Sequence, residues 1–434
     1  MYRRALEELV SWKKSTSRKP LIIEGARQVG KTWLMKEFGE KYYNEMVYIN
    51  FDDNPEMENL FKLNLDPQRI IRGLSLYSGK TIHPDTTLII FDEVQEVPRA
   101  LSSLKYFYEN APQYHIVCAG SLLGIALHEG TSFPVGKVDF LRLCPMNFDE
   151  FLRANDKDQL ADMLMAGDEE LINVFGSTCQ DLLKSYYVVG GMPEAVLSYI
   201  TEHDYRKVQT IQKNILSAYE HDFSKHAPKD IVPKISLVWH SIPSQLAREN
   251  NRFLYGAVRE GGRAREFETA IEWLNDCGLI YKLYRTTHPA LPLKSVLDLK
   301  CFKIYMNDVG LLSCLSGLHP EILLRGNDLF VEFKGALTEQ YVMQELTCLS
   351  EFQSGYYTNG RSTAEIDFLI DIGTSILPLE VKASTNLKAK SLKTYIESFG
   401  PSQAIRCSMA DYRRENIILN LPLFAVGYIR SYLQ

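Results

Sequence analysis

Long apolar runs are missing from this sequence, which narrows the classes of protein it can encode. No apolar stretch approaches the roughly 18 to 20 residues that a membrane-spanning helix needs, so no membrane partner is expected. The N-terminal stretch MYRRALEELVSWKK contains no apolar segment of the kind found in signal peptides. Both absences predict a cytoplasmic protein.

Paired cysteines and an excess of positive charge are missing too. The eight cysteines are scattered without a C-x-x-C pair, so we expect reduced thiols and no zinc site. His221 and His226 lack the spacing of metal ligands, and we interpret them as part of a solvated linker. The formal net charge of −6 excludes a generally basic nucleic-acid coat, so any contact with nucleic acid has to be local.

What the sequence does contain is centred on the stretch from Leu21 to Phe38. It includes a match to G-x-x-x-x-G-K-[ST] between an apolar run and an amphipathic run. The matching residues are Gly25, Ala26, Arg27, Gln28, Val29, Gly30, Lys31 and Thr32. Glycines at both ends permit the turn and the close approach with which backbone N–H groups surround a phosphate.

This pattern predicts an ATP site formed by a strand, a glycine loop and a helix. In such a site Lys31 reaches the β- and γ-phosphates, and the Thr32 hydroxyl binds Mg²⁺. The competing interpretation is an ordinary glycine turn before a helix.

A second pattern follows the apolar run from Thr87 to Phe91, where Asp92 and Glu93 stand at the end of an expected buried strand. It is the Walker B pattern, in which Asp92 holds Mg²⁺ through water. Glu93 then orients or deprotonates the water that attacks the γ-phosphate. The alternative is a strand that simply ends in two solvated acids.

Ser121 follows a further apolar strand, His115 to Ala119. If this strand lies beside the phosphate-loop strand, the Ser121 hydroxyl is placed to sense the γ-phosphate. A helix N-cap is an equally good interpretation of Ser121. The alternation of strands and helices up to about residue 150 predicts a doubly wound α/β domain.

The motifs GARQVGKT, IIFDEVQEVP, CAGSLLG and LCPMNFDEFL resemble those of bacterial and archaeal AAA-type P-loop ATPases. In that group the ATPase module is followed by a C-terminal domain of uncharacterised function, and the resemblance covers nearly the whole chain. It implies an enzyme that hydrolyses ATP. A Gly-Arg pair common in the group is Gly136-Lys137 here, so no arginine finger is assigned at that point. Arg142 is an alternative position for the arginine finger.

The middle of the chain is expected to be helical, and the resemblance implies a lid over the nucleotide. Helices followed by a strand from Gly278 to Tyr284 then resemble a winged helix. Arg259, Arg263 and Arg265 lie where a recognition helix would contact phosphates or bases. Glutamates alternate with them, so binding of DNA and binding of a protein both stay open.

About the last hundred residues contain a second candidate site. A long helix with Glu339 is followed by strands with Asp367 and with Glu380-x-Lys382, then by a helix and another strand. This order resembles the restriction-endonuclease-like nucleases, and Glu339 matches the helix glutamate of their resolvase branch. The two-residue repeat of a strand places Glu380 and Lys382 on one face.

At this second site two carboxylates, Asp367 and Glu380, could hold Mg²⁺ while Lys382 steers or activates the attacking water. The alternative is that these acids are a solvated surface and that the domain only binds. An acid-x-Lys pair is common on exposed strand faces, so the spacing alone favours the solvated surface, whereas the order of the elements and the resemblance favour the nuclease-like fold.

The patterns together predict an α/β protein with four parts. These are an AAA-type ATPase domain at residues 1–152, a helical lid or linker at 153–230, a winged-helix-like domain at 231–312 and a nuclease-like α/β domain at 313–434. We expect ATP and Mg²⁺ as cofactors, with ATP hydrolysis coupled to a domain that acts on or binds nucleic acid. The alternative is a nucleotide-driven switch or scaffold that binds a protein partner, and oligomerisation stays open.

Overall fold

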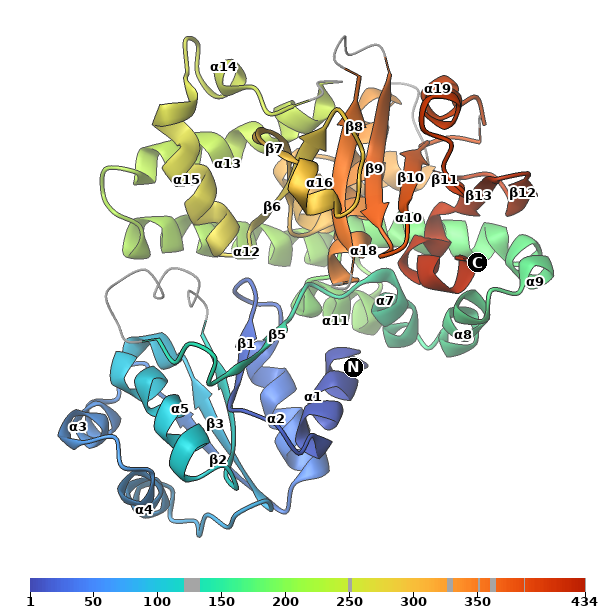
Figure 1. Ribbon diagram of the computed structural model, residues 1–434. Helices are drawn as coiled ribbons and strands as arrows, with labels where there is room; N and C mark the ends of the chain where they lie inside the picture. The colour runs from blue at the N-terminus through green and yellow to red at the C-terminus, as the bar shows by residue number, and fades with distance from the viewer. Residues whose placement is uncertain are drawn as a thin grey trace. The chain divides into compact units, whose positions relative to one another are not determined.

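The computed structural model describes residues 1–120, 133–248, 252–325, 331–349, 352–359, 364–385 and 387–433. The chain divides into two compact units, each with its own β-sheet. We call residues 2–144 with 276–278 the N-terminal unit, and residues 145–275 with 279–434 the C-terminal unit. Figure 1 shows the N-terminal unit mainly in blue and cyan and the C-terminal unit from green to red.

The N-terminal unit contains a five-stranded sheet in the order β2-β3-β4-β1-β5, in which all neighbours are parallel. Its strands are β1 (Leu21–Glu24), β2 (Glu45–Asn50), β3 (Thr87–Asp92), β4 (His115–Ala119) and β5 (Asp139–Arg142). β3 and β4 are buried along their whole length, as parallel strands covered on both faces are. The α/β fold class expected from the sequence is confirmed, because the strands of this parallel sheet alternate with helices along the chain.

Helices pack on this sheet because successive strand residues point to opposite faces. Those of the unit are α1 (Ala5–Lys14), α2 (Lys31–Tyr42), α3 (Pro55–Leu63), α4 (Pro67–Ser78), the 3₁₀ turn η1 (Val94–Glu96) and α5 (Pro98–Asn110). Ile89 and Phe91 of β3 share one hydrophobic core with apolar residues of α3, α4 and α5. Helix α2 contacts β2, β3 and β4 and starts directly after the glycine loop.

The C-terminal unit contains an eight-stranded mixed sheet in the order β12-β13-β11-β10-β9-β8-β6-β7. Its strands are β6 (Ile280–Thr286), β7 (Asp298–Met306), β8 (Gln353–Thr358), β9 (Glu365–Asp371), β10 (Ile376–Val381), β11 (Ala404–Ser408), β12 (Arg413–Glu415) and β13 (Ile418–Pro422). β8, β9 and β10 are antiparallel neighbours, whereas β11 is parallel to β10. The strand expected from Gly278 to Tyr284 is β6, and it pairs with both β7 and β8. The expected winged-helix region and the expected C-terminal domain therefore share one sheet.

Helices surround this second sheet. Those before β6 are α7 (Phe148–Ala154), α8 (Asp158–Ala166), α9 (Glu169–Val174), α10 (Gly176–Val189), α11 (Pro193–Glu202), α12 (Tyr205–His226), α13 (Val232–Ala247), α14 (Tyr255–Val258) and α15 (Ala264–Asp276). Those after it are η2 (Leu293–Val296), α16 (Val309–Leu315), α17 (Pro320–Arg325), α18 (Val331–Cys348), α19 (Lys390–Phe399) and η4 (Leu423–Tyr432). The interpretation of His221 and His226 as linker residues is wrong, because α12 continues through both.

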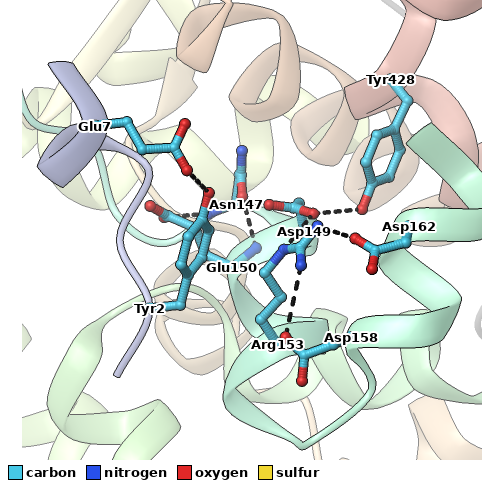
Figure 2. A network of polar contacts seen from close by, with 9 residues as sticks. All are labelled: Tyr2, Glu7, Asn147, Asp149, Glu150, Arg153, Asp158, Asp162 and Tyr428. Atoms are coloured by element: carbon cyan, nitrogen blue, oxygen red, sulfur yellow. Dashed lines mark hydrogen bonds and ion pairs between the residues drawn. The ribbon is translucent and has the colours of Figure 1, made fainter. Parts of the chain in front are cut away.

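The helices expected to form a lid are joined to the C-terminal end of the chain by a polar network. Arg153 of α7 lies 3.1 Å from an oxygen of Asp149, 3.5 Å from Asp158 and 2.8 Å from Asp162. Tyr428 of η4 donates a hydrogen bond of 2.7 Å to Asp149 (Figure 2). These contacts make α7 and α8 part of the C-terminal unit.

A glycine pair makes a second join inside the same unit. Gly190 has a φ of 70°, and a Cβ on it would lie 2.2 Å from a carboxylate oxygen of Asp308. The N–H of Gly191 donates to Asp308 over 2.6 Å, so α10 is held against the start of α16. In the part of the chain that the structure describes, no helix has the length and apolar character to span a membrane.

Candidate functional sites

The glycine loop between β1 and α2 has the backbone that phosphate binding requires. Gly25, Gln28 and Gly30 have φ angles of 151°, 67° and 95°. A Cβ on Gly25 would lie 2.2 Å from the carbonyl oxygen of Leu143, so only glycine fits there. Because α2 begins at Lys31, the unpaired N–H groups of its first turn belong to this loop and favour an anion.

Lys31 places one buried cation at the loop. Its residue is 7% exposed, and its Nζ donates to the carbonyl oxygens of Gly25 and Ala26 at 2.7 and 2.8 Å. Burial lowers the pKa of Lys31 to about 8, while the negative charges of Glu93 and Asp92 act in the opposite direction. Phosphate oxygens would replace the two carbonyls as stronger, charged acceptors.

Thr32 and Asp92 meet beside this lysine, as the sequence predicts. The Thr32 hydroxyl donates to Asp92 Oδ2 over 2.7 Å, and the Tyr48 hydroxyl donates to the same oxygen over 2.9 Å. A hydroxyl and a carboxylate are oxygen ligands of the kind that Mg²⁺ takes, so the residues fit the expected ion. Tyr48 was missed, because the sequence shows only an apolar strand around it.

Glu93 follows Asp92 with a φ of 51°, an uncommon conformation for a residue with a side chain. Its N–H donates to Asp92 Oδ1 over 3.1 Å, and its Oε2 accepts a hydrogen bond of 2.7 Å from Gln95. Backbone strain of this kind is concentrated at functional sites. The geometry orients the Glu93 carboxylate, which is what a residue that positions water needs.

Ser121 and Arg142 are the two other residues considered for the ATP site. Ser121 lies outside the described residues. Arg142 lies in β5 opposite Glu24 of β1, and its positive charge partly counteracts the rise that burial causes in the pKa of Glu24.

A cavity of about 480 Å³ lies in the C-terminal unit, where α13 and α18 pack on β7 beside β9 and β10. We call it the C-terminal cavity. It is lined by the four residues that the sequence singled out, Glu339, Asp367, Glu380 and Lys382. It is also lined by four charged residues that sequence reasoning missed, which are Lys303, Glu365, Arg248 and Arg252.

The predicted acids and lysine contact one another or nearby backbone. Lys382 Nζ lies 2.6 Å from Glu380 Oε1, so the two side chains share a face as the strand repeat predicts. The other oxygen of Glu380 accepts the N–H of Leu392 at 3.1 Å, near the start of α19. Asp367 accepts the N–H of Val381 at 2.7 Å, which fixes β9 against β10.

Lys303 brings a second cation into the cavity from β7. Its Nζ lies 2.6 Å from Glu365 Oε1 and 3.5 Å from Glu339 Oε2, and Tyr305 also donates to Glu339, at 3.1 Å. Burial lowers the pKa of Lys303, but the surrounding acids, Glu339 first among them, outweigh it and hold this pKa well above its usual value. The sequence did contain a signal that could have pointed to Lys303 and Glu365. Lys303 and Tyr305 are two residues apart on one strand face, and so are Glu365 and Asp367.

Asp367 is in an unfavourable position for a charge. Burial raises its pKa well above the usual value, and the charges of Glu339 and Glu365 raise it further, while Lys303 opposes them. Such shifts occur where several acids are forced together, which is frequent at functional sites.

Among the described residues, no group of three or more His, Cys, Asp or Glu side chains is placed to hold a metal ion. The cavity offers carboxylate oxygens, which suit Mg²⁺ or Mn²⁺. However, Glu339, Glu365 and Glu380 each contact a lysine. An ion shared by Asp367 and Glu380 would therefore require Lys382 to move away from Glu380.

The three arginines of the expected recognition helix differ from one another. Arg259 donates to Glu266 over 2.6 Å and lies over the ring of Phe267, so its charge is already paired. Arg263 stands just before α15 and Arg265 in its first turn, and both are exposed.

Comparisons with known proteins support an ATPase domain in the N-terminal part of the chain. Residues 17–152 match the family model described as "AAA domain". Residues 180–322 and 334–424 match two models described as domains of unknown function, DUF8612 and DUF4143. No curated protein matches the chain.

Several solved structures are similar in part. A Walker-type ATPase of Pyrococcus abyssi is 14% identical, with 72% of this chain and 95% of that chain covered and a TM-score of 0.43. The ORC1 protein of Aeropyrum pernix in complex with DNA is 14% identical, with coverages of 73% and 91% and a TM-score of 0.29. The RuvB Holliday junction branch migration motor of Thermotoga maritima is 12% identical, with coverages of 65% and 90% and a TM-score of 0.28. The assignment of an ATPase domain follows from the family match and from the geometry of the glycine loop.

Proposed function

We propose that this protein, whose residues 17–152 are an AAA-type P-loop ATPase domain, hydrolyses ATP and couples the hydrolysis to a nuclease-like site in the C-terminal cavity. The observation that carries the first part is the hydrogen bond of 2.7 Å between Thr32 and Asp92 beside the buried Lys31. It brings together residues of two separate motifs, which supports a site for MgATP.

At the ATP site each residue has a distinct task. Lys31 neutralises the β- and γ-phosphates, and Thr32 and Asp92 hold Mg²⁺, which when bound offsets the charge of the phosphates. Glu93, oriented by Gln95, positions the attacking water and accepts its proton.

In the C-terminal cavity the proposal is phosphodiester hydrolysis. Asp367 and Glu380 would bind a divalent ion, which when bound stabilises the negative charge that develops on the phosphate oxygens. Lys382 would steer the attacking water, and Glu339 would support the site from α18. This is supported by one cavity that collects the four side chains from α18, β9 and the end of β10.

A switch without nuclease activity is the second candidate. It is favoured by the ion pairs of Lys382 with Glu380 and of Lys303 with Glu365, which neutralise acids without a metal. In that case ATP would change how the protein binds a partner, and the acids would be structural.

Cleavage assays with purified protein separate the two candidates. Branched, single-stranded and duplex nucleic acids are incubated with Mg²⁺ or Mn²⁺, with and without ATP. We expect cleavage that Asp367→Asn abolishes while ATP hydrolysis continues, because the P-loop lies in a different unit. Absence of wild-type cleavage under all conditions would favour the switch, and cleavage that survives Asp367→Asn would place the activity elsewhere.

A further inference from the structure

Two arginines line the C-terminal cavity but belong to neither predicted site. Arg248 follows the last residue of α13, and Arg252 stands four positions later. Both side chains are exposed, and neither has an ion pair with another described residue. They differ in this from Lys303 and Lys382, which are paired with acids inside the cavity.

The backbone near both arginines is fixed to the walls of the cavity. The side-chain amide of Gln245 in α13 donates to the carbonyl of Leu254 at 2.8 Å and accepts the N–H of Leu254 at 3.0 Å. The N–H of Phe253 donates to the carbonyl of Phe302 in β7 at 2.7 Å, and the two rings stack 5.9 Å apart. Arg252 is therefore held next to β7, the strand that also carries Lys303.

The charges of the cavity are arranged in two zones. Glu339, Glu365 and Glu380 lie with their lysines inside, while the arginines are exposed. A small free anion that entered the interior would meet these carboxylates at close range and be repelled. A polyanion can instead keep its phosphates on the exposed arginines while a single ester group reaches the acids.

We infer that Arg248 and Arg252 bind backbone phosphates of a polynucleotide strand and hold that strand across the C-terminal cavity. This inference rests on the proposed function and adds the residues that bind the substrate. Contacts to phosphates position a strand without reading its sequence, so the binding is independent of base sequence. The end of α13 thus completes a site whose acids lie on β9, β10 and α18.

Binding is measured without cleavage, using full-length Asp367→Asn protein in EDTA. Fluorescence anisotropy reports the affinity for labelled single-stranded DNA, duplex DNA and single-stranded RNA over a series of NaCl concentrations. The test variant carries Arg248→Ala and Arg252→Ala. The matched control carries Arg413→Ala and Arg414→Ala, which removes two exposed arginines from β12 at the opposite edge of the sheet from β7.

The test variant should lose about tenfold or more in affinity at low salt. The slope of log affinity against log salt should become shallower by about 1.4 for a single strand or about 1.8 for a duplex, as expected for two lost phosphate contacts. The control should keep the original slope. A variant with Arg248→Lys and Arg252→Lys should also keep most of the original slope. This result would show that the loss in the alanine variant comes from the missing charges and not from misfolding.

An unchanged slope in the test variant, or an equal change in the control, would overturn the inference. So would the absence of binding to all three polymers. Arginine-dependent binding by a protein whose wild type never cleaves would instead uphold the inference and refute the proposed nuclease activity. The preferred polymer distinguishes DNA from RNA.

Discussion

The two candidate sites differ in which groups contact their carboxylates. At the P-loop, Asp92 accepts hydrogen bonds from the neutral hydroxyls of Thr32 and Tyr48. In the C-terminal cavity, Glu380 and Glu365 lie 2.6 Å from the ammonium groups of Lys382 and Lys303. A hydroxyl can turn its oxygen toward an incoming cation, whereas an ammonium group repels one. We therefore expect the first site to accept a metal ion as it stands, and the second to do so only after Lys382 has moved away from Glu380.

The largest effect should follow from the loss of the P-loop cation. Lys31→Ala removes the positive charge aimed at the β- and γ-phosphates, so ATP hydrolysis should fall by about a thousandfold or more. Phosphate release and calorimetric ATP titration measure this. Lys41→Ala, at an exposed lysine of the same helix that is paired with Glu37, is the control and should behave as wild type. Hydrolysis near the wild-type rate in Lys31→Ala would disprove the site.

Glu93→Gln should have the next largest effect and separate chemistry from binding. It removes the base but keeps the size of the side chain and the contacts of Asp92, so turnover should slow by roughly 10² to 10⁴ while ATP binding stays nearly intact. Single-turnover kinetics with a fluorescent ATP analogue measure both quantities. Weak ATP binding in this variant would show that Glu93 acts through the structure of the loop.

The two sites also differ in how much of each could be predicted from the sequence. The P-loop site is made from two short motifs, and the spacing within each predicts which side chains lie beside the glycine loop. β3 and β4 start where the sequence indicates, since each is an uninterrupted apolar run. Tyr48, which donates to Asp92, comes from outside the motifs.

The C-terminal cavity depends on contacts between distant segments. Asp367, Glu380 and Lys382 could be found because they match the D…E-x-K pattern over a short stretch of sequence. Lys303 instead reaches the cavity through the pairing of β6 with β7 and β8. No local pattern reveals which strands of a mixed sheet become neighbours. Arg248 was missed for the same reason, because its place at the cavity depends on how α13 packs against β7.

Within the C-terminal cavity, Lys382→Ala should reduce metal-dependent cleavage by about 10- to 100-fold, because it removes a positioning charge and leaves the carboxylates in place. Glu339→Gln should be milder, since Glu339 contacts Tyr305 and Lys303 at the edge of the acidic group. ATP hydrolysis is the internal control and should not change in either variant. If Lys382→Ala tightens Mn²⁺ binding without affecting cleavage, the lysine only neutralises Glu380 and the comparison of the two sites has to be revised.

The smallest effect is expected from Arg263 and Arg265 at the start of α15, and it decides which basic surface binds nucleic acid. Arg263→Glu with Arg265→Glu reverses two exposed charges. If Arg248 and Arg252 hold the strand, the slope of log affinity against log salt should still change by less than the amount expected for about one lost phosphate contact. The neighbouring acid Glu266 already neutralises Arg259, which keeps the local potential of this helix low. A slope that becomes shallower by about two contacts would instead assign phosphate recognition to α15 as a winged-helix surface. Anisotropy titrations over the salt series used for Arg248 and Arg252 place both pairs on one scale, so the larger change in slope identifies the surface that meets the phosphates.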